Sequence, residues 1–389
     1  LAGVMSVGML SGCGSKTLDG TKTVATVDGT DIPLGVVSLY AREQQQQTTT
    51  MYLNYMGSAD NIWDQTAGDD SDETYGDQAV TSSLESIEKM YVLKEKAADY
   101  KVELTDDDEA AIADAASQFM AANSEETIKE LAVTEDQVKT LLELQTIQKK
   151  MYDPVVEEGN ITVSDDEANQ TTFTYVSIST SGDDVTDEEK ETKKEQAQEI
   201  LDKMKEDPAA DMSEIAKGVD DSYSAVQGNF TTKESEDEDE DSSSEAYPDE
   251  VLKVLRGLKD GEVADNIIET DTGYYVVRLD KINDEDATAS KRESLQNSKE
   301  STYFTDTTAK WLDEADVKVV KKVLKTLKIT DKHTFMAPTP TPIPETPTPE
   351  VTEEATPTPE TEEVTETPAA EETVEATETP EATPTEAAK

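Results

Sequence analysis

The chain has 389 residues, a length typical of two or three domains. It carries 88 Asp and Glu against 34 Lys and Arg, so its formal net charge is −54. A field of this sign repels nucleic acid and anionic membrane surfaces. The single cysteine, Cys13, and the single histidine, His333, exclude a disulfide or a Cys/His zinc site within one chain. We therefore expect no metal, no cofactor and no nucleic-acid partner.

The N-terminal segment is apolar and small and ends in Leu10-Ser11-Gly12-Cys13. A stretch of this kind is typical of the end of a secretory signal segment, and it is too short to span a membrane. The motif resembles the bacterial lipobox, whose cysteine is lipidated and becomes the mature N-terminus. We expect residues 1–12 to be the end of a lipoprotein signal peptide and residues 13–22 a lipid-anchored linker. Cys13 would then hold the protein at the outer face of the cell membrane, with no other membrane contact.

The C-terminal segment, residues 337–389, differs sharply in composition from the rest. It contains 11 of the 15 prolines, 14 Glu, one Lys and no aromatic residue. Such a composition cannot bury enough apolar surface to offset the entropy of ordering, so we expect a disordered, extended tail. The tail accounts for −13 of the charge and leaves −41 on residues 1–336.

Two regions outside the middle of the chain are predicted to be helical. Residues 23–168 begin with a β-branched strand and an Asp-Gly turn at 28–29, and apolar residues then recur at helical spacing. Capping boxes at Thr134 and Ser164 mark two helix starts. Residues 285–336 return to helix, with Trp311 and Leu312 as apolar anchors. The stretch 317–329 alternates apolar residues with lysine and fits strand or helix; its lysines are interpreted as a solvated face.

The central region, residues 169–284, has a different pattern of apolar and polar residues. The pattern predicts strands at 173–179, 263–269 and 274–279, and helices after a capping box at Thr186, at 212–217 and at 251–258. Gly218 is expected to end the second of these helices in the left-handed conformation. This order of elements predicts a small α+β domain.

Four short elements of this region resemble the second half of a parvulin domain. They are Gln227-Gly228-Asn229-Phe230, Tyr247-Pro248, the Gly-Glu turn at 261–262 and the Gly-Tyr strand that starts at 273. The order of lipobox, Val-Asp-Gly strand, helices, parvulin-like insert and returning helix is the layout of the PrsA/SurA-type extracytoplasmic foldases. The resemblance implies an α+β protein in which residues 23–168 and 285–336 pack as one helical chaperone domain. The parvulin-like domain, residues 169–284, would be inserted into it.

The same resemblance implies a function and a site. The protein is expected to be a peptidyl-prolyl isomerase that assists unfolded or newly exported polypeptides, a reaction that needs neither nucleophile nor metal. Parvulins usually carry two facing histidines, and here Tyr175 and Tyr275 stand at those positions. Asp221 falls at the Cys/Asp position of the family, and Phe230 and Val251 are candidate pocket walls or plain core residues. The two phenols could hydrogen-bond to each other, since each can donate and accept.

Other interpretations remain open at this point. The missing histidines favour a binding chaperone whose parvulin domain has lost catalysis. The Thr/Pro/Glu tail would suit a protein that acts as a tethered spacer in the cell wall, but that interpretation gives the folded residues no function. The acidic run Glu234–Asp241 could bind Ca²⁺ loosely or repel acidic clients, although a solvated insertion is the preferred interpretation because the run lacks the pattern of an EF-hand loop.

Overall fold

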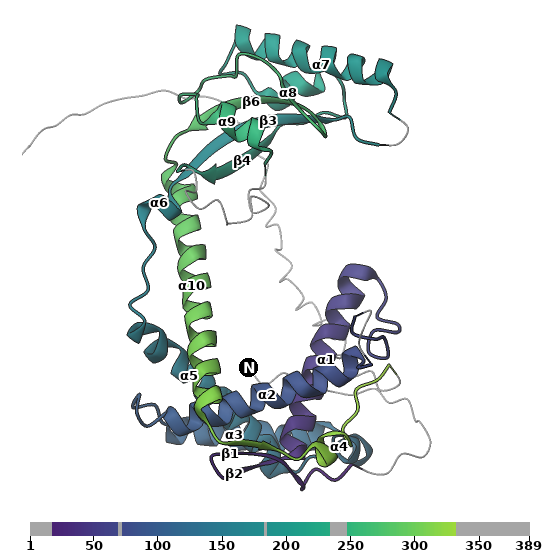
Figure 1. The fold of residues 1–389 in the computed structure, drawn as a ribbon, viewed down its shortest axis with the longest axis vertical. Helices are drawn as coiled ribbons and strands as arrows, with labels where there is room; N and C mark the ends of the chain where they lie inside the picture. The colour runs from purple at the N-terminus through teal and green to yellow at the C-terminus, as the bar shows by residue number, and fades with distance from the viewer. Residues whose placement is uncertain (1–17, 69–71, 183–184, 234–246, 332–389) are drawn as a thin grey trace, which may run out of the picture. The chain divides into compact units, whose positions relative to one another are not determined.

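The computed structural model describes residues 18–68, 72–182, 185–233 and 247–331 (Figure 1). Cys13 with its lipobox, the acidic run Glu234–Asp241, His333 and the segment 337–389 lie outside these residues. The described chain is a mixture of helices with two antiparallel sheets, so the expected α+β fold is confirmed.

The N-terminal segment forms a β-hairpin where one strand was expected. Strands β1 (Thr23–Val27) and β2 (Thr30–Pro33) pair antiparallel across Asp28 and Gly29, whose φ angles are 47° and 86°. Positive φ at both positions is what a two-residue hairpin turn requires, and Asp-Gly satisfies it. The second strand was missed because Ile32 is its one fully buried apolar side chain.

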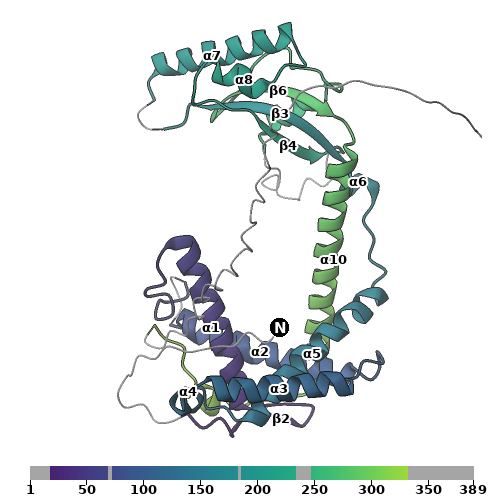
Figure 2. The ribbon, with the colours of Figure 1, turned by 180° about the vertical axis from the view of Figure 1, so that it is seen from behind.

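The helices of the N-terminal region follow the hairpin. They are α1 (Leu34–Met56), α2 (Tyr75–Lys96), α3 (Asp106–Ala122), α4 (Glu125–Leu131), α5 (Glu135–Glu158) and α6 (Asp165–Ala168). Both predicted capping boxes are confirmed: Thr134 exchanges hydrogen bonds with Gln137 and Ser164 with Glu167. Helix α2 packs on α1 and α5, and α3 packs on α5 (Figure 2).

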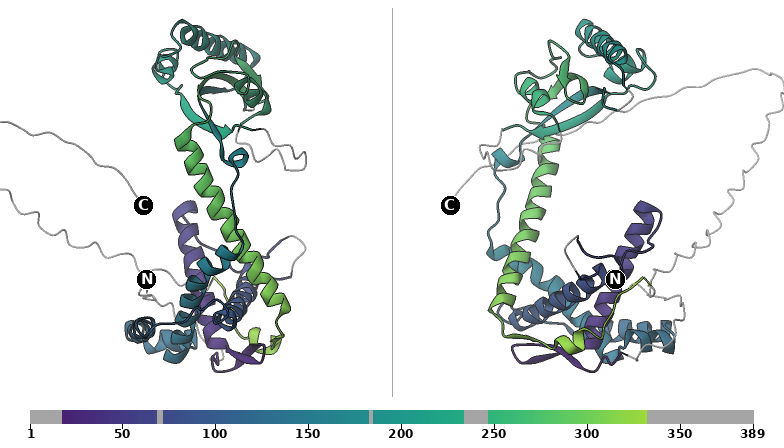
Figure 3. Two further views of the ribbon diagram at one scale, coloured as in Figure 1. Left: turned by 90° about the vertical axis from the view of Figure 1, so that its left-hand side faces the viewer. Right: turned by 45° about the vertical axis from the view of Figure 1, so that its right-hand side comes forward.

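The C-terminal segment returns to this helical region. Helix α10 (Glu285–Glu314) runs unbroken and contacts α2 (Figure 3), and it is followed by β7 (Val317–Val319) and α11 (Lys321–Leu324). The stretch 317–329 therefore contains both a strand and a helix. Strand β7 pairs antiparallel with the free edge of β1, which gives the sheet order β2-β1-β7.

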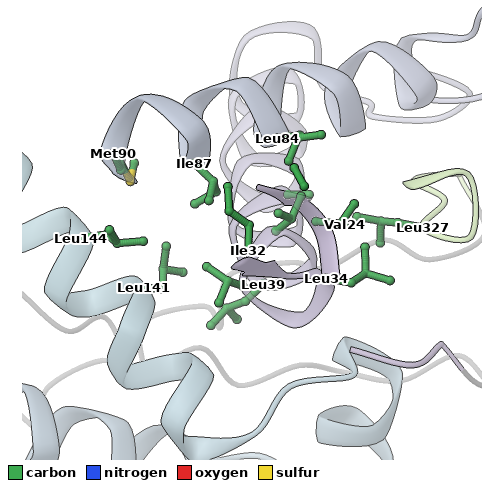
Figure 4. Close-up of a cluster of buried hydrophobic side chains, with 14 of the residues drawn as sticks. Val24, Ile32, Leu34, Leu39, Leu84, Ile87, Met90, Leu141, Leu144 and Leu327 are labelled. Carbon is green, nitrogen blue, oxygen red and sulfur yellow. The ribbon is translucent and has the colours of Figure 1, made fainter. Parts of the chain in front are cut away.

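One apolar core joins the first and last segments of the described residues. The hairpin, α1, α2 and α5 contribute buried side chains such as Val24, Ile87 and Leu144, and Leu327 joins them from the C-terminal segment (Figure 4). Arg42 on α1 also donates a hydrogen bond of 2.7 Å to the carbonyl of Lys328. The expected packing of the C-terminal segment on the N-terminal region is thus present.

The central region forms the second sheet, in the order β4-β3-β6-β5. Its elements are β3 (Gln170–Ser179), α7 (Asp187–Glu206), α8 (Met212–Lys217), β4 (Val226–Thr231), α9 (Asp249–Leu255), β5 (Ile268–Thr270) and β6 (Gly273–Lys281). Helices α7 and α8 cover one face of the sheet, and α9 packs on the other (Figure 1).

The central region differs from the sequence expectations at three points. Strand β4 was not among the expected strands, because Gly228 and Asn229 disfavour a strand until β3 supplies its ladder. Residues 263–269 do not form one strand: Val263 makes an isolated bridge and β5 starts only at Ile268. Gly218 has φ −70°, since the chain leaves α8 in a right-handed turn in which Gly218 N–H bonds Glu214.

Candidate active site

The alternation of the strands separates two sets of side chains on the second sheet. On β3 and β6, Val176 and Tyr274 point into the core under α7 and α8, whereas Phe173 and Val277 point into the core under α9. Since successive strand residues face opposite sides, Tyr275 lies on the α9 face although its neighbour Tyr274 does not.

Tyr175 and Tyr275 come together on the α9 face. They are diagonal neighbours in the ladder, because Tyr175 stands opposite Val277 and Tyr275 opposite Ser177. Their ring centroids lie 5.9 Å apart with the planes inclined at 31°. In the described part of the chain no hydrogen bond joins the two hydroxyls, so contact between rings takes the place of the hydrogen bond that the sequence suggested. Both side chains are half-buried.

Tyr247 is a third member of this group, although the sequence did not identify it as a site residue. Its ring meets that of Tyr175 edge-on at 5.6 Å and that of Phe173 at 4.9 Å. A Cβ at Gly228 on β4 would collide with the Tyr247 hydroxyl, so the glycine leaves the space that this phenol fills. The pair Tyr247-Pro248 was visible as a family element, but its contact with Gly228 depends on the pairing of β4.

The environment raises the pKa of two of these phenols. Burial raises the pKa of Tyr275, and the neighbouring Tyr175 adds to the effect, while a hydrogen bond with Thr272 opposes it. Burial also raises the pKa of Tyr247, with Tyr175 again contributing. Tyr247 and Tyr275 are therefore neutral hydrogen-bond donors at neutral pH.

Phe230 and Val251 lie beneath this aromatic group. Val251 on α9 is fully buried, and Phe230 on β4 is 6% exposed. The Phe230 ring packs edge-on against Phe173 at 5.8 Å, and the guanidinium of Arg256 lies 5.6 Å from the centroid of the Phe230 ring. Both residues belong to the core that supports the tyrosines. Their service as walls of a substrate pocket stays a prediction.

Asp221 lies in the turn between α8 and β4 and is exposed. Its neighbour Asp220 organises that turn by accepting hydrogen bonds from the backbone N–H and the hydroxyl of Ser222, at 2.9 and 2.6 Å. Within the described residues, no contact joins the Asp221 carboxylate to the tyrosines. A role for Asp221 in the reaction stays a prediction.

The arrangement limits the chemistry of the site. Tyr175 stacks on Phe173, Tyr247 meets both of these rings edge-on, and Tyr275 contacts Tyr175, so the three phenols form one aromatic surface. Such a surface can pack a small apolar ring and donate hydrogen bonds to an amide. Across the described ranges, no three His, Cys, Asp or Glu side chains gather in a way that could hold a metal ion. None of the helices described there is long and apolar enough to cross a membrane.

Comparison with known proteins identifies this region. Residues 183–292 match the family model described as the PPIC-type PPIASE domain. The match starts after β3, so it includes Asp221, Tyr247 and Tyr275 but not Tyr175. Among curated proteins, none matches the chain.

Several solved structures are similar to the chain at low identity. The foldase protein PrsA from Lactococcus lactis is 18% identical, with 77% of this chain and 96% of that chain covered and a TM-score of 0.32. The peptidylprolyl isomerase PrsA from Bacillus anthracis is 17% identical, with 59% of this chain and 96% of that chain covered and a TM-score of 0.26. A structure from a study of two SurA-like chaperones in Campylobacter jejuni is 12% identical, with 77% of this chain and 99% of that chain covered and a TM-score of 0.24. Likeness of this degree does not by itself assign a function.

The family match, in contrast, covers β4, β5 and β6 and helices α7, α8 and α9, although it leaves out the central strand β3. It confirms the parvulin-like nature that the Gly-Glu turn and the Gly-Tyr strand implied. Residues 183–292 are therefore similar to the PPIC-type PPIASE domain, in agreement with the parvulin-like elements of the sequence.

Proposed function

We propose that this protein is a membrane-anchored extracytoplasmic foldase that catalyses the cis–trans isomerisation of X–Pro bonds in exported polypeptides. The observation that carries the proposal is the contact of Tyr175 with both Tyr247 and Tyr275, on a sheet whose later strands match a PPIC-type domain. Residues 169–284 would form the isomerase domain, and residues 23–168 with 285–336 the chaperone domain.

The proposed mechanism follows from the origin of the barrier. Rotation about the peptide bond costs about 18–20 kcal/mol because it breaks amide resonance. In the twisted state the lone pair is localised on the proline nitrogen, where a hydroxyl can donate to it. The aromatic faces would hold the proline ring, and Tyr275 would supply the hydroxyl. A hydrogen bond formed only in the twisted state lowers the barrier without tightening the ground state.

Anchoring of the protein rests on the lipobox at Cys13. One lipid-modified cysteine would tether the chain while all of the described residues stay in water. Labelling of growing cells with a fatty-acid analogue tests this part separately: label should enter the full-length protein and be lost on Cys13→Ser. Label that persists in the Cys13→Ser protein would contradict the anchor.

A kinetic assay tests the isomerase activity. The full chain should accelerate isomerisation of an X–Pro peptide, and Asp221→Ala should lower kcat/KM if Asp221 takes part as the family pattern implies. Asp202→Ala, at an exposed position of α7, is the matched control and should leave the rate unchanged. Absence of any acceleration by the unmodified protein would refute the enzymatic proposal.

The second candidate function is a binding chaperone without catalysis. It is favoured by one observation, namely that both strand positions that carry histidine in the family carry tyrosine here, at Tyr175 and Tyr275. An aromatic surface can bind a proline-containing segment without lowering the barrier. Suppression of aggregation of an unfolded client, together with no effect on X–Pro exchange, would select this alternative.

A further inference from the structure

A basic surface lies where the C-terminal segment returns to the hairpin. Residues 317–330 contain five lysines and no Asp or Glu, although the chain as a whole has a net charge of −54. Strand β7 and helix α11 belong to this stretch, and both contact β1. We call five exposed side chains of this stretch the β7–α11 surface: Val319, Val320, Lys321, Lys322 and Lys325.

The structure divides the five lysines into two kinds. Lys318 forms an ion pair with Asp316, and Lys328 forms one with Asp77 at 2.6 Å. The other three are exposed, and within the described residues no ion pair or side-chain hydrogen bond holds their ammonium groups: Lys321, Lys322 and Lys325. Their charge is therefore not used by the folded part of the chain.

Two exposed valines adjoin these lysines. Val319 and Val320 are 38% and 42% exposed, whereas Val24 and Val27 on the adjoining strand β1 are fully buried. Because the two valines directly precede the first two lysines, apolar and cationic side chains are presented together. A partner that fits this surface carries negative charge and also offers an apolar region.

The β7–α11 surface lies beside the start of the described chain. The backbone N–H of Val320 donates to the carbonyl of Val24 at 2.8 Å, so α11 begins next to the start of β1. Leu18 packs on the same core as Val24 (Figure 4) and lies five residues after Cys13. Five residues span at most about 18 Å. A lipid on Cys13 would therefore keep this end of the helical region close to the bilayer.

We infer that the β7–α11 surface binds the surface of an anionic phospholipid bilayer, with the three lysines at the headgroup phosphates and the two valines in the interface. Lysines close to an anionic bilayer are attracted to it. The net charge of −54 opposes the approach at long range only, because charges further apart than about 8 Å are screened at physiological ionic strength.

The inference rests on the lipid anchor of the proposed function and deepens it. A single acyl chain binds a membrane weakly, and a basic surface is the kind of second signal that makes the attachment stable. Contact through the β7–α11 surface would also orient the helical region on the bilayer. This inference revises two expectations from the sequence, namely that these lysines are a solvated face and that the anchor is the sole membrane contact.

The other possible occupants match only part of the surface. The segment 337–389 has 14 Glu and one Lys, which suits the lysines, but its Thr/Pro/Glu composition offers little to the two valines. A soluble polyanion would likewise use the lysines alone. A second copy of the chain would bring a further −54 of charge and repel the first as a whole. Each of these occupants is an outcome of the test.

The test is an acetylation footprint of the full chain, coupled through the thiol of Cys13 to a maleimide lipid in vesicles. One set of vesicles contains equal parts of phosphatidylglycerol and phosphatidylcholine, and the other contains phosphatidylcholine alone. Mass spectrometry measures how fast each lysine reacts. On the anionic vesicles Lys321, Lys322 and Lys325 should react about fivefold more slowly than on the neutral ones. The difference should disappear in high salt, which screens the attraction.

Three lysines of the PPIC-type domain are the matched control in the same sample. They are exposed, and no ion pair holds them within the described residues: Lys217, Lys253 and Lys259. They should react at the same rate on both kinds of vesicle. The inference is overturned if the lysines of the β7–α11 surface show no difference between the vesicles, or if the control lysines are protected to the same extent.

A double variant tests the apolar part of the surface. Val319→Ser, Val320→Ser keeps all three lysines and should lose most of their protection. Val226→Ser is the control, because Val226 is a 50% exposed valine on β4. Protection that is equal in the double variant and the unmodified protein would overturn the inference, because the surface would then recognise charge alone, as for a soluble polyanion.

Two measurements without vesicles test the remaining occupants. Removal of residues 337–389 should leave the reaction rates of the three lysines unchanged; faster reaction would identify that segment as the occupant and overturn the inference. The uncoupled protein should sediment in the same oligomeric state with and without Lys321→Glu, Lys322→Glu. A dimer that these substitutions abolish would identify a second copy and overturn the inference as well.

Failure of this inference is distinguishable from failure of the proposed function. Absence of fatty-acid label in cells would remove the anchor, whereas the footprint on chemically coupled vesicles would still report on the β7–α11 surface. The double variant Val319→Ser, Val320→Ser should isomerise an X–Pro peptide at the rate of the unmodified protein, because both valines lie outside residues 183–292. Isomerase activity without protection of the lysines would remove this surface and leave the catalytic proposal.

Discussion

The ring of Tyr175 on β3 lies 5.9 Å from the ring of Tyr275 on β6, although the ladder places Tyr175 opposite Val277. This diagonal contact brings two phenols to one face of the sheet, at the positions where parvulins, which this region resembles, usually have histidines. Tyr247 meets Tyr175 edge-on. Substitution of single tyrosines by phenylalanine keeps the ring packing and removes only the hydroxyl, so it tests the two contributions separately.

We predict that Tyr275→Phe lowers kcat/KM for an X–Pro peptide by about tenfold, because the ring stays and the hydrogen-bond donor is lost. A fall in kcat with little change in KM is expected, since the hydroxyl acts in the twisted state. Tyr274→Phe is the control: it is the next residue of β6 but lies in the core under α7 and α8. Equal losses in the two variants would refute a specific role for Tyr275.

Gly228→Ala should disturb the site without a change to any phenol. A Cβ at this position collides with the Tyr247 hydroxyl and comes close to Phe173, so Tyr247 must move. We expect the isomerase rate to fall several-fold and the domain to lose about 1–2 kcal/mol of stability. Gly257→Ala is the control, because its Cβ would meet only the carbonyl of Val254, at 3.3 Å. Chemical denaturation and the peptide assay measure the two effects, and full activity in Gly228→Ala would contradict the placement of Tyr247.

The contrast between Tyr275 and Tyr247 shows what the sequence could predict of the site. Tyr275 was placed correctly on the last strand, because the Gly-Tyr element and the alternation of that strand are local features. Tyr247 and Gly228 face each other only when β4 pairs with β3, and no local feature of the sequence predicts β4. No local feature of the sequence predicts whether Tyr175 and Tyr275 meet through their hydroxyls or through their rings.

The same distinction between local and long-range features holds for the fold. Helix starts that depend on adjacent residues, such as those at Thr134 and Thr186, could be predicted and are confirmed. The region 263–269 is apolar and β-branched enough to suggest a strand, yet tertiary contacts leave only Ile268–Thr270 in the ladder. The pairing of β7 with β1 joins residues almost at opposite ends of the described chain. The resemblance to a family predicted that these two segments pack together, but it did not predict a strand pairing.

Asp331→Ala should destabilise the helical region. The Asp331 carboxylate accepts hydrogen bonds from the backbone N–H groups of Ile62, Trp63 and Asp64, at 2.8, 3.0 and 2.9 Å. Loss of a charged acceptor leaves these donors unpaired, so we expect a loss of about 2–3 kcal/mol in the free energy of unfolding. Asp313→Ala, at an exposed position of α10, should change it by less than about 0.5 kcal/mol. Equal stability of the two variants would mean that the C-terminal segment is not docked through Asp331.

Glu88 on α2 should make stability depend on pH. Burial, with a smaller contribution from Glu85, raises the pKa of Glu88 from 4.5 to about 7, and its Oε1 atom is buried without a hydrogen-bond partner. Because the pKa is higher in the folded state, the stabilising effect of the protonated form is complete below about pH 4.5 and is lost as the pH rises through about 7.

Glu88→Gln should therefore stabilise the protein by about 1–3 kcal/mol more at pH 8 than at pH 5. Thermal unfolding at the two pH values measures the difference. Glu293→Gln removes the same charge from an exposed position of α10 and should show no such dependence. A gain in Glu88→Gln that is the same at both pH values would contradict the raised pKa.

The central claim, that the tyrosine group catalyses isomerisation, is tested most directly by exchange NMR on an X–Pro peptide mixed with a small amount of the full chain. Unaided exchange takes tens to hundreds of seconds, so cis and trans resonances show no cross-peaks on the subsecond timescale of the experiment. With the unmodified protein we predict cross-peaks between them, strongly reduced in the double variant Tyr247→Phe, Tyr275→Phe. Absence of cross-peaks with the unmodified protein, or their full retention in the double variant, would contradict the account.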